Sequence, residues 1–510
     1  MKKLVFLIAV SLLFACNQAD KSKRDFGTAQ GDLGNGYFLN PILGGDYPDP
    51  TIMREGKDYY MTHSSFDYVP GLVVFHSTDL VNWQPISYAL KRYLGSVWAP
   101  DICKHEDRYY IYFTVAHPSG RMNFVTYADS PYGPWSDPID LKVGNIDPGH
   151  AVGEDGSRWI FLSGGQRARL NDDGLSIVPG SLEKVYEGWI YPSDWVTEGM
   201  CLEGPKIRKI GDYFYYLNAE GGTAGPPTSH MVVAARSKSI NGPWENSPYN
   251  PIVRTWQASE RWWSKGHGSI IDSPKGDWWI VYHAYENGFT SLGRQTLLEP
   301  IKWTSDGWFV APSGTAIERP LKKPLSSGEK IDRRSRLGEF RVGLDWKFYK
   351  DFDTSRFEVN QGELTLQAQG DSPGNSSPIM CVAGERAYEI EVEIEKDEHA
   401  TAGLVLYYNS NFYAGIGFDQ QRTLRFRQGI LRTASRHEGG NHLWLRLRND
   451  HQVLTGAYSY DGINWIKETW GMEISGYNHN TLYEFQSMLP ALYAAGGGKV
   501  KFRNFKYTSL

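Results

Sequence analysis

The sequence has few cysteines, no excess of basic residues and no long apolar stretch beyond its first residues. Four cysteines occur among 510 residues. Cys103, Cys201 and Cys381 are far apart and odd in number, and no C-x-x-C pair occurs, which argues against a disulfide framework and a cysteine zinc site. The formal net charge of −5 argues against nucleic acid as the main partner. No later stretch approaches about 18 apolar residues, so nothing beyond the start is expected to span a membrane.

Motifs of several other enzyme classes are missing as well. There is no H-E-x-x-H, which argues against a zinc hydrolase, and no G-x-S-x-G; the glycines at 496–498 lack the spacing of a phosphate loop. Helix signals are nearly absent. Aromatic residues are abundant instead, with 18 Trp, 31 Tyr and 22 Phe beside 54 Gly and 27 Pro. Many aromatic and turn residues together predict numerous short strands.

Residues 1–16 are typical of an export signal. Lysines at positions 2 and 3 precede an apolar run over 4–14, and the segment ends at Cys16. This ending resembles the lipobox of bacterial lipoproteins, in which the cysteine is lipidated; a plain secretory signal with a chance cysteine is the alternative. We expect an exported protein anchored to a bacterial membrane by a lipid on Cys16, with residues 17–36 as a flexible tether.

One short pattern recurs five times in the first part of the chain. Each copy begins with a polar residue flanked by proline or glycine and leads, 8 to 12 residues later, into an aromatic-rich strand. The copies begin at 48–50, 99–101, 147–149, 203–205 and 266–268. Five such units predict a five-bladed β-propeller over residues 37–320. A sandwich of irregular hairpins is the alternative, but it gives no reason for a fivefold repeat.

The pattern fades after Trp308, and the rest of the chain has a different character. Residues 311–342 are basic and turn-rich, as expected of a connecting segment. Apolar and polar residues then alternate, most clearly at 387–394, which predicts a β-sandwich over residues 338–510. The expected fold class is all-β, a five-bladed β-propeller followed by a β-sandwich.

The residues that begin the five copies are candidates for the chemistry. If they are structurally equivalent, Asp49, Asp101, Asp147, Glu203 and His267 form a ring at one end of the central channel. Burying several carboxylates together is costly unless function uses them. Cleavage of a glycosidic bond uses such a pair, one protonated as the acid and one charged as the base. The alternative is that these residues only cap turns, but four acids at matching positions favour catalysis.

These motifs are similar to those of glycoside hydrolase family 43, the five-bladed propeller β-xylosidases and α-L-arabinofuranosidases. The resemblance runs from Tyr37 to the C-terminus. It rests on the segments 47–50, 64–66, 70–72, 79–83, 98–101, 133–135, 146–148, 203–205, 219–223, 266–268 and 293–296. The C-terminal part, with residues 402–408, looks like the concanavalin-like domain of the family's xylosidase branch.

The resemblance implies a role for each of three acids. Asp49 is expected to be the general base that activates water, and Glu203 the general acid that protonates the leaving oxygen. Asp147 is expected to orient that acid and to modulate its pKa. Because members of the family invert the anomeric configuration, the base and the acid are expected about 6.5–9.5 Å apart.

Further residues are candidates for binding the substrate or a metal ion. The resemblance implies that Arg294 binds substrate hydroxyls, and that His267 holds a metal ion, often calcium, through water or supports the acid. Trp98 is expected to form a wall against the sugar, because a flat apolar ring suits the face of a pyranose. Phe66 is a second candidate, with core packing as the competing interpretation. His230 is a further candidate for substrate binding, because its place at the start of a blade strand could direct it toward the pocket.

The implied activity is an inverting, exo-acting glycoside hydrolase that releases terminal β-xylosyl or α-L-arabinofuranosyl residues from plant-polysaccharide oligosaccharides. The chemistry requires no cofactor, and bound calcium in the channel is a candidate addition. The alternatives are an arabinan- or galactan-cleaving hydrolase of the same fold, a retaining fructoside-type propeller and a non-catalytic glycan-binding propeller. Residues 147–151 and 165–191 follow the family pattern loosely, which leaves the preferred sugar open. Trp189, in the second of these segments, is interpreted as core packing.

Overall fold

The computed structural model describes residues 31–510 except 313, 327, 433 and 434. The predicted export signal and the tether up to residue 30 lie outside the described residues. Within the described part of the chain, no helix is both long enough and apolar enough to cross a membrane. Five small sheets form the blades of a propeller and two larger sheets form a sandwich, which confirms the predicted fold class.

The five blades follow one another along the chain, and each is antiparallel. Blade 1 contains β2 (Thr51–Glu55), β3 (Asp58–Thr62), β5 (Gly71–Ser77) and β6 (Gln84–Leu90). Blade 2 contains β7 (Ser96–His105), β8 (Arg108–His117), β9 (Gly120–Ala128) and β10 (Ile139–Asp140). Blade 3 contains β11 (Gly149–Val152), β12 (Arg158–Leu162), β13 (Gln166–Arg169) and β14 (Glu183–Lys184). Blade 4 contains β15 (Glu203–Ile210), β16 (Tyr213–Glu220), β17 (Met231–Ser237), β18 (Glu245–Asn246) and β19 (Val253–Arg254). Blade 5 contains β20 (Trp262–Asp272), β21 (Trp278–Glu286), β22 (Arg294–Trp303) and β23 (Phe309–Val310).

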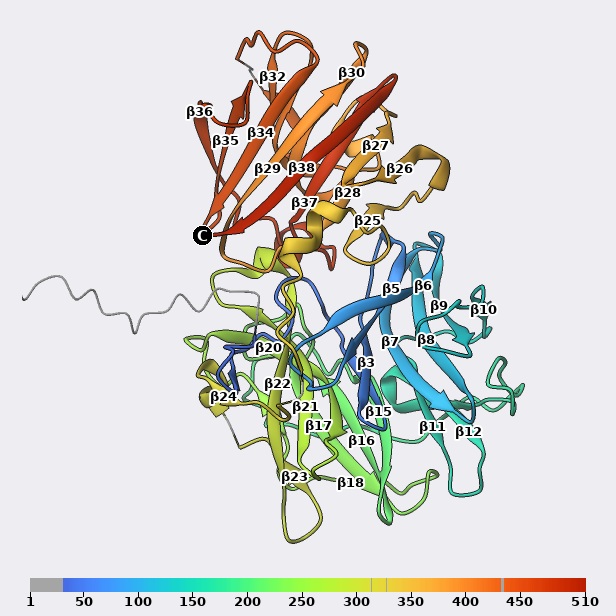
Figure 1. Cartoon of the computed structure of the whole chain (residues 1–510). Coiled ribbons are helices and arrows are strands. Elements are labelled where there is room, and N and C mark those ends of the chain that lie inside the picture. The colour runs from blue at the N-terminus through green and yellow to red at the C-terminus, as the bar shows by residue number, and fades with distance from the viewer. Residues whose placement is uncertain (1–30, 313, 327, 433–434) are drawn as a thin grey trace, which may run out of the picture.

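The sandwich lies on one side of the propeller, as Figure 1 shows in orange and red. Its first sheet has the order β33 (Ile430–Arg432), β32 (Thr423–Arg427), β31 (Phe412–Phe418), β30 (Ala400–Asn409), β37 (Leu489–Gly496), β28 (Ile379–Cys381), β25 (Trp346–Tyr349) and β4 (Tyr68–Val69). Its second sheet has the order β26 (Phe357–Asn360), β27 (Glu363–Gln367), β38 (Lys499–Ser509), β29 (Ala387–Lys396), β34 (His442–Asp450), β35 (Val453–Ser459) and β36 (Trp465–Glu473). The short helix α1 (His479–Leu482) and the pair β1 (Tyr37–Phe38) and β24 (Leu321–Lys322) lie outside these sheets.

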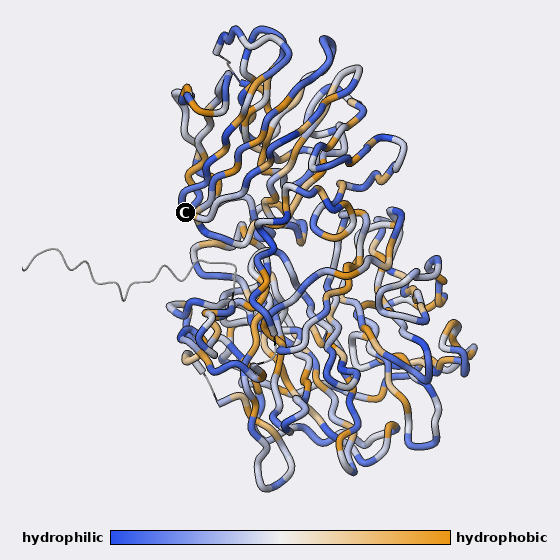
Figure 2. The backbone as a smooth tube through the Cα atoms, in the orientation of Figure 1, coloured by the Kyte–Doolittle hydropathy of each residue, from blue (hydrophilic) through white to orange (hydrophobic). Residues whose placement is uncertain are grey.

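The alternating sequence of β29 shows why these segments form half-buried strands. Ile390, Val392 and Ile394 are fully buried in the sandwich core, whereas the glutamates between them are half-buried. Figure 2 shows the same alternation of apolar and polar positions along several sandwich strands. Successive side chains of a strand point to opposite faces, so a period of two places one set in the core and the other outside it.

The two domains share a sheet and several polar contacts. Strand β4 belongs to the propeller segment between β3 and β5, yet it pairs with β25 of the sandwich. Gln486 of the sandwich donates a hydrogen bond from Nε2 to Asp67 Oδ2 of the propeller at 3.0 Å. The sandwich segment that follows α1 is thereby held against the propeller beside the central channel.

Residues 31–33 belong to the predicted flexible tether, but in the structure they pack against the propeller. Asp32 is buried, and its Oδ2 lies 2.6 Å from Lys323 Nζ in the segment that follows the propeller. Lys323 also contacts Asp79 at 2.8 Å. Two carboxylates around one ammonium fix this part of the chain to blade 1, which a polar, glycine-rich composition does not reveal.

Candidate active site

The blade heads share an unusual backbone conformation. Asp49, Asp147 and His267 have φ angles of 55°, 60° and 51°, and Ala99 and Gly204 have φ angles of 31° and 60°. Residues other than glycine rarely adopt this left-handed backbone region. The strain that it causes is found mostly at functional positions. The shared angle marks the equivalent positions of the five blades at the start of the innermost strands.

Asp101 does not join the predicted ring. Ala99 holds the equivalent position in blade 2, and Asp101 lies two residues further along β7. Its Oδ1 accepts a hydrogen bond from Thr51 Oγ1 at 2.9 Å and lies 3.0 Å from Lys206 Nζ. The prediction of five equivalent heads was therefore wrong for this residue, because the acid of this motif lies two residues past the equivalent position. It was wrong by one residue for Glu203, since Gly204 holds the equivalent position in blade 4.

One histidine contacts all three predicted catalytic acids. His267 Nδ1 lies 3.5 Å from Asp49 Oδ1, and Nε2 lies 3.7 Å from Asp147 Oδ2 and 3.6 Å from Glu203 Oε1. Burial alone would lower the pKa of His267, but the charge of Asp49 and the contacts with Glu203 and Asp147 raise it above its usual value. The structure thus brings the three acids together around one imidazolium.

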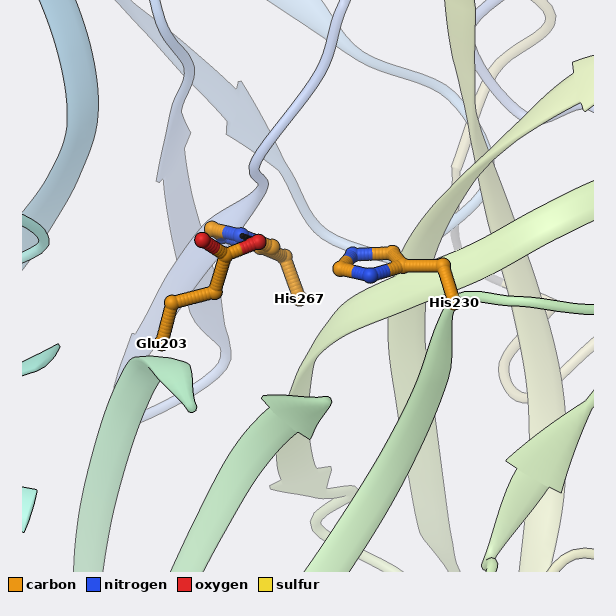
Figure 3. A group of neighbouring side chains, drawn as sticks. All are labelled: Glu203, His230 and His267. Carbon is orange, nitrogen blue, oxygen red and sulfur yellow. Dashed lines mark ion pairs between the residues drawn. The ribbon is translucent and has the colours of Figure 1, made fainter. Parts of the chain in front are cut away.

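Glycines make room for this arrangement. A Cβ atom on Gly204 would lie 3.0 Å from the His267 ring, and one on Gly266 would lie 1.7 Å from His230. Figure 3 shows the side chains of Glu203 at the start of β15, His230 just before β17 and His267 within β20 lying near one another. The glycines next to Glu203 and His267 are therefore part of the site, because a side chain at Gly266 would displace the histidine behind it.

Asp49 is held as a carboxylate. Arg294 Nη1 donates a hydrogen bond to Oδ1 at 2.9 Å, His283 Nδ1 lies 3.0 Å from the same oxygen, and Ser64 Oγ donates to Oδ2. Burial would raise the pKa of Asp49, but the charges of Arg294 and His267 and the contact with His283 hold it well below the usual value. A charged carboxylate can accept a proton from water, as a general base must.

Asp147 is held in the opposite way. Its Oδ2 accepts a hydrogen bond from the Gly204 amide at 3.0 Å, which links it to the residue after Glu203. Burial, together with the charges of Glu203 and Asp49, raises the pKa of Asp147 to about 7 against the opposing effect of His267. The pKa values of Asp49 and Asp147 are therefore shifted in opposite directions within one cluster, which suits a charged base and a buried orienting partner.

The three acids differ in their access to solvent. The side chain of Glu203 is 19% exposed, whereas those of Asp49 and Asp147 are 5% and 4% exposed. Because Asp49 and Glu203 each contact one edge of the same imidazole, the ring separates them, an arrangement compatible with the spacing of about 6.5–9.5 Å in inverting enzymes. The buried Asp49 is suited to the role of base, and the more exposed Glu203 is suited to the role of acid, which must reach the leaving group.

Replacing Asp147 by Asn is expected to remove an ionisation near pH 7 from the kcat/KM profile. Burial and the charges of Glu203 and Asp49 raise the pKa of Asp147 to about 7, so this carboxyl changes charge within the assayed range, whereas Asn stays neutral. Profiles of both proteins between pH 5 and pH 9, on one aryl glycoside, check this. An unchanged alkaline limb with reduced kcat would leave Asp147 with an orienting role only.

His267 was predicted near a metal ion, and His230 was predicted to face the substrate. Glu203, His230 and His267 each place a ligand atom within 4.8 Å of the others, and both ring nitrogens of His230 are buried without a hydrogen-bond partner. Calcium takes six to eight oxygen ligands, so two imidazoles and one carboxylate do not fit it directly. A metal ligand must also be a neutral imidazole, whereas the raised pKa of His267 favours its protonated form. Calcium held through water remains a prediction, and the chemistry derived below does not use it.

The predicted substrate-binding rings meet a ring from the sandwich. Phe66 stacks on Phe485 with centroids 6.5 Å apart, and Trp98 meets Phe485 edge-on at 5.8 Å. The Arg294 guanidinium lies 5.0 Å from the centroid of Phe485, and His479 stacks on its other side at 3.9 Å. Phe485 was not predicted, because nothing in the sequence of the 478–488 segment indicates that it reaches the other domain.

Glu220 is a second residue whose importance was missed. It is fully buried at the end of β16, where Oε1 accepts a hydrogen bond from the Trp189 amide at 2.7 Å and Oε2 has no partner. Burial raises the pKa of Glu220 to about 8. A neutral carboxyl therefore holds the segment 187–202, which leads into Glu203.

Replacing Glu220 by Gln is expected to stabilise the protein at alkaline pH and not at acid pH. A carboxyl whose pKa is raised on folding loses stability as pH rises from about 4.5 to about 8, and Gln keeps the hydrogen bond without the charge. The gain at pH 9 is on the order of 1–3 kcal/mol. Melting temperatures of both proteins at pH 5 and pH 9 measure it, and an equal difference at both pH values would contradict the assignment.

Comparisons with known proteins identify the family of both domains. The sequence-family model "Glycosyl hydrolases family 43" matches residues 38–309. A second family model, "Beta xylosidase C-terminal Concanavalin A-like domain", matches residues 339–508. Two relatives are each 32% identical: a non-reducing end alpha-L-arabinofuranosidase of Bacteroides ovatus, over 72% of this chain and 73% of its own, and a xylan 1,3-beta-xylosidase of Vibrio sp, over 92% and 98%. The solved structure of a GH43 protein of Bacillus licheniformis, 28% identical, covers 93% of this chain and 100% of its own with a TM-score of 0.83.

Proposed function

The chain belongs to glycoside hydrolase family 43, and we propose that it uses Asp49 as base, Glu203 as acid and Asp147 as orienting partner to release terminal β-xylosyl or α-L-arabinofuranosyl residues with inversion. The observation that carries this proposal is the cluster of three acids around His267, with Asp49 held charged and Asp147 with a raised pKa. A single-displacement hydrolysis needs a charged base and a separate acid, and Asp49 and Glu203 lie next to different nitrogens of His267.

The proposed reaction transfers one proton at each end of the bond that breaks. Asp49 accepts a proton from a water molecule, whose oxygen forms the new bond to the anomeric carbon. Glu203 gives its proton to the glycosidic oxygen as the bond from that oxygen to the anomeric carbon breaks. Arg294 and His267 keep Asp49 ionised while the water is positioned. The product sugar and the shortened glycan leave, and solvent restores both proton states.

The depth of the base supports exo action. Asp49 is buried and Glu203 is partly exposed, so the sugar that is released lies on the inner side and the leaving group on the outer side. Trp98 and Phe485 form a wall beside this site with rings from both domains, whereas Phe66 stacks on Phe485 but is 3% exposed and belongs to the core. An aromatic wall can pack against the flat apolar face of a terminal sugar ring.

The preferred sugar is tested with aryl glycosides. The relatives carry names of xylosidases and arabinofuranosidases, so we expect turnover of 4-nitrophenyl β-D-xyloside, α-L-arabinofuranoside or both. The panel includes the β-D-galactoside, and arabinan and galactan are tested separately. Turnover confined to galactoside or arabinan would favour the alternative specificities, and no turnover at all would favour a glycan-binding propeller.

We also propose that the protein is exported and lipid-anchored through Cys16. The support is the order of a positive start, an apolar run and a terminal cysteine in residues 1–16. Expression in a bacterial host with labelled fatty acid is expected to label the wild-type chain and not the Cys16→Ala variant. Equal labelling of both proteins would contradict the anchor.

A further inference from the structure

A group of aromatic side chains lies on the segment that leads into Glu203 and on the loop after β19. We call this group the aromatic platform; it consists of Trp189, Tyr191, Trp195, Trp256 and the side chain of Arg254. Trp256 is 57% exposed, and the first three rings are half-buried. Core packing explains a half-buried ring, but it does not explain Trp256.

The platform is braced by its own contacts. The Arg254 guanidinium lies 3.4 Å from the centroid of Trp195, and its Nε donates a hydrogen bond to the Thr228 carbonyl at 3.0 Å. Tyr191 lies parallel to Trp195 with centroids 6.3 Å apart, and Trp256 meets Trp195 edge-on at 5.7 Å. Rings held in one geometry before binding lose little conformational entropy when a ligand arrives.

The register of blade 4 places the platform relative to the catalytic acid. Glu203 on β15 pairs with Ala219 on β16, and Glu220 pairs with Met231 on β17. Met231 in turn pairs with Arg254 on β19. Neighbouring strands are about 4.8 Å apart, so Arg254 lies roughly 14 Å outward from Glu203 along the same end of the blade.

The position of the platform on the side of Glu203 indicates which ligand it binds. A general acid must contact the oxygen of the leaving group, so the remaining glycan leaves the site on the side of Glu203. From these positions we propose that the aromatic platform binds the sugar rings of the leaving pentose chain beyond the first one, so that the enzyme prefers longer oligosaccharides. Flat aromatic rings on an exposed surface suit the apolar faces of such sugars. This inference rests on the proposed function of the site.

The kinetic test compares substrates of different length. Wild-type protein and the Trp256→Ala and Trp195→Ala variants are assayed on aryl xyloside and aryl arabinofuranoside, and on xylohexaose and arabinohexaose. For the longer substrate that the wild type cleaves, each variant is expected to raise KM by about 3- to 10-fold with kcat unchanged, while aryl glycosides are cleaved as before. Tyr132→Ala is the matched control, because Tyr132 is also 57% exposed but lies on the outer part of blade 2.

A binding measurement separates this inference from the proposed function. Titration calorimetry on Glu203→Gln protein, with and without Trp256→Ala, measures the affinity for the same hexaoses without turnover. Loss of affinity in the double variant supports the platform even if the catalytic assignment fails. Equal affinities, or equal KM values for all proteins, would overturn it. Unchanged affinity together with a changed oligomeric state would assign this surface to a second copy of the chain.

Discussion

Asp49→Asn is expected to lower kcat by about 10²–10⁴-fold on aryl and on natural substrates alike, with KM changed little. Asn cannot accept a proton from water, whereas the carboxylate in this position is kept charged by Arg294 and His267. The loss does not depend on the leaving group, because the base acts on the water and not on the bond to the aglycone. Initial rates on 4-nitrophenyl glycosides and on xylobiose or arabinobiose measure it.

Two controls separate a chemical loss from misfolding. Asp58→Asn makes the same substitution in the same blade, on a residue whose carboxylate pairs with His76, and is expected to keep activity within a few-fold. The melting temperature of each variant shows whether the unpaired Arg294 destabilises the fold. A folded Asp49→Asn protein with near wild-type kcat would contradict the assignment of the base.

Glu203→Gln is expected to have an effect that depends on the leaving group. A sugar hydroxyl leaves poorly without a proton, so kcat for xylobiose or arabinobiose is expected to fall by about 10²–10⁴-fold. A 2,4-dinitrophenolate leaves readily, so the dinitrophenyl glycoside is expected to lose much less. The ratio of the two losses identifies the acid, because a merely structural defect lowers both rates equally.

The matched control for this variant is Glu198→Gln, five residues before the acid on the same segment. Glu198 accepts a hydrogen bond from the Ala224 amide at 2.8 Å, and Gln can keep that contact. We expect both substrates to be cleaved at nearly the wild-type rate. Equal losses on the two leaving groups in Glu203→Gln would remove Glu203 from the role of acid.

The propeller and the clustering of the three candidate acids were predictable because each depends on local sequence. The turn residues around Asp49, Asp147 and Glu203 mark the start of an inner strand, and the fivefold recurrence shows that these starts belong together. Asp101 shows the limit of that reasoning, since the acid of its motif lies two residues past the equivalent position, which Ala99 holds. A repeat in sequence therefore locates the blades more reliably than the direction of one side chain.

The parts that were missed depend on contacts between distant segments. Phe485 reaches the site only because β4 joins a sandwich sheet and Gln486 bonds to Asp67. Glu220 was visible as part of a family motif, but its raised pKa arises from burial that composition does not reveal. The aromatic platform likewise combines residues from segments about 60 positions apart, whose contacts, such as Trp195 with Arg254 and Trp256, arise only in the folded chain.

Proton NMR of the first sugar released tests the central claim most directly. With an aryl β-D-xyloside or α-L-arabinofuranoside, whichever the enzyme cleaves, spectra are recorded before the free sugar mutarotates. If Asp49 activates water for a single displacement, the first product is the opposite anomer, α-xylose or β-L-arabinofuranose. If the first product keeps the configuration of the substrate, Asp49 is not the general base of an inverting reaction and the account is wrong.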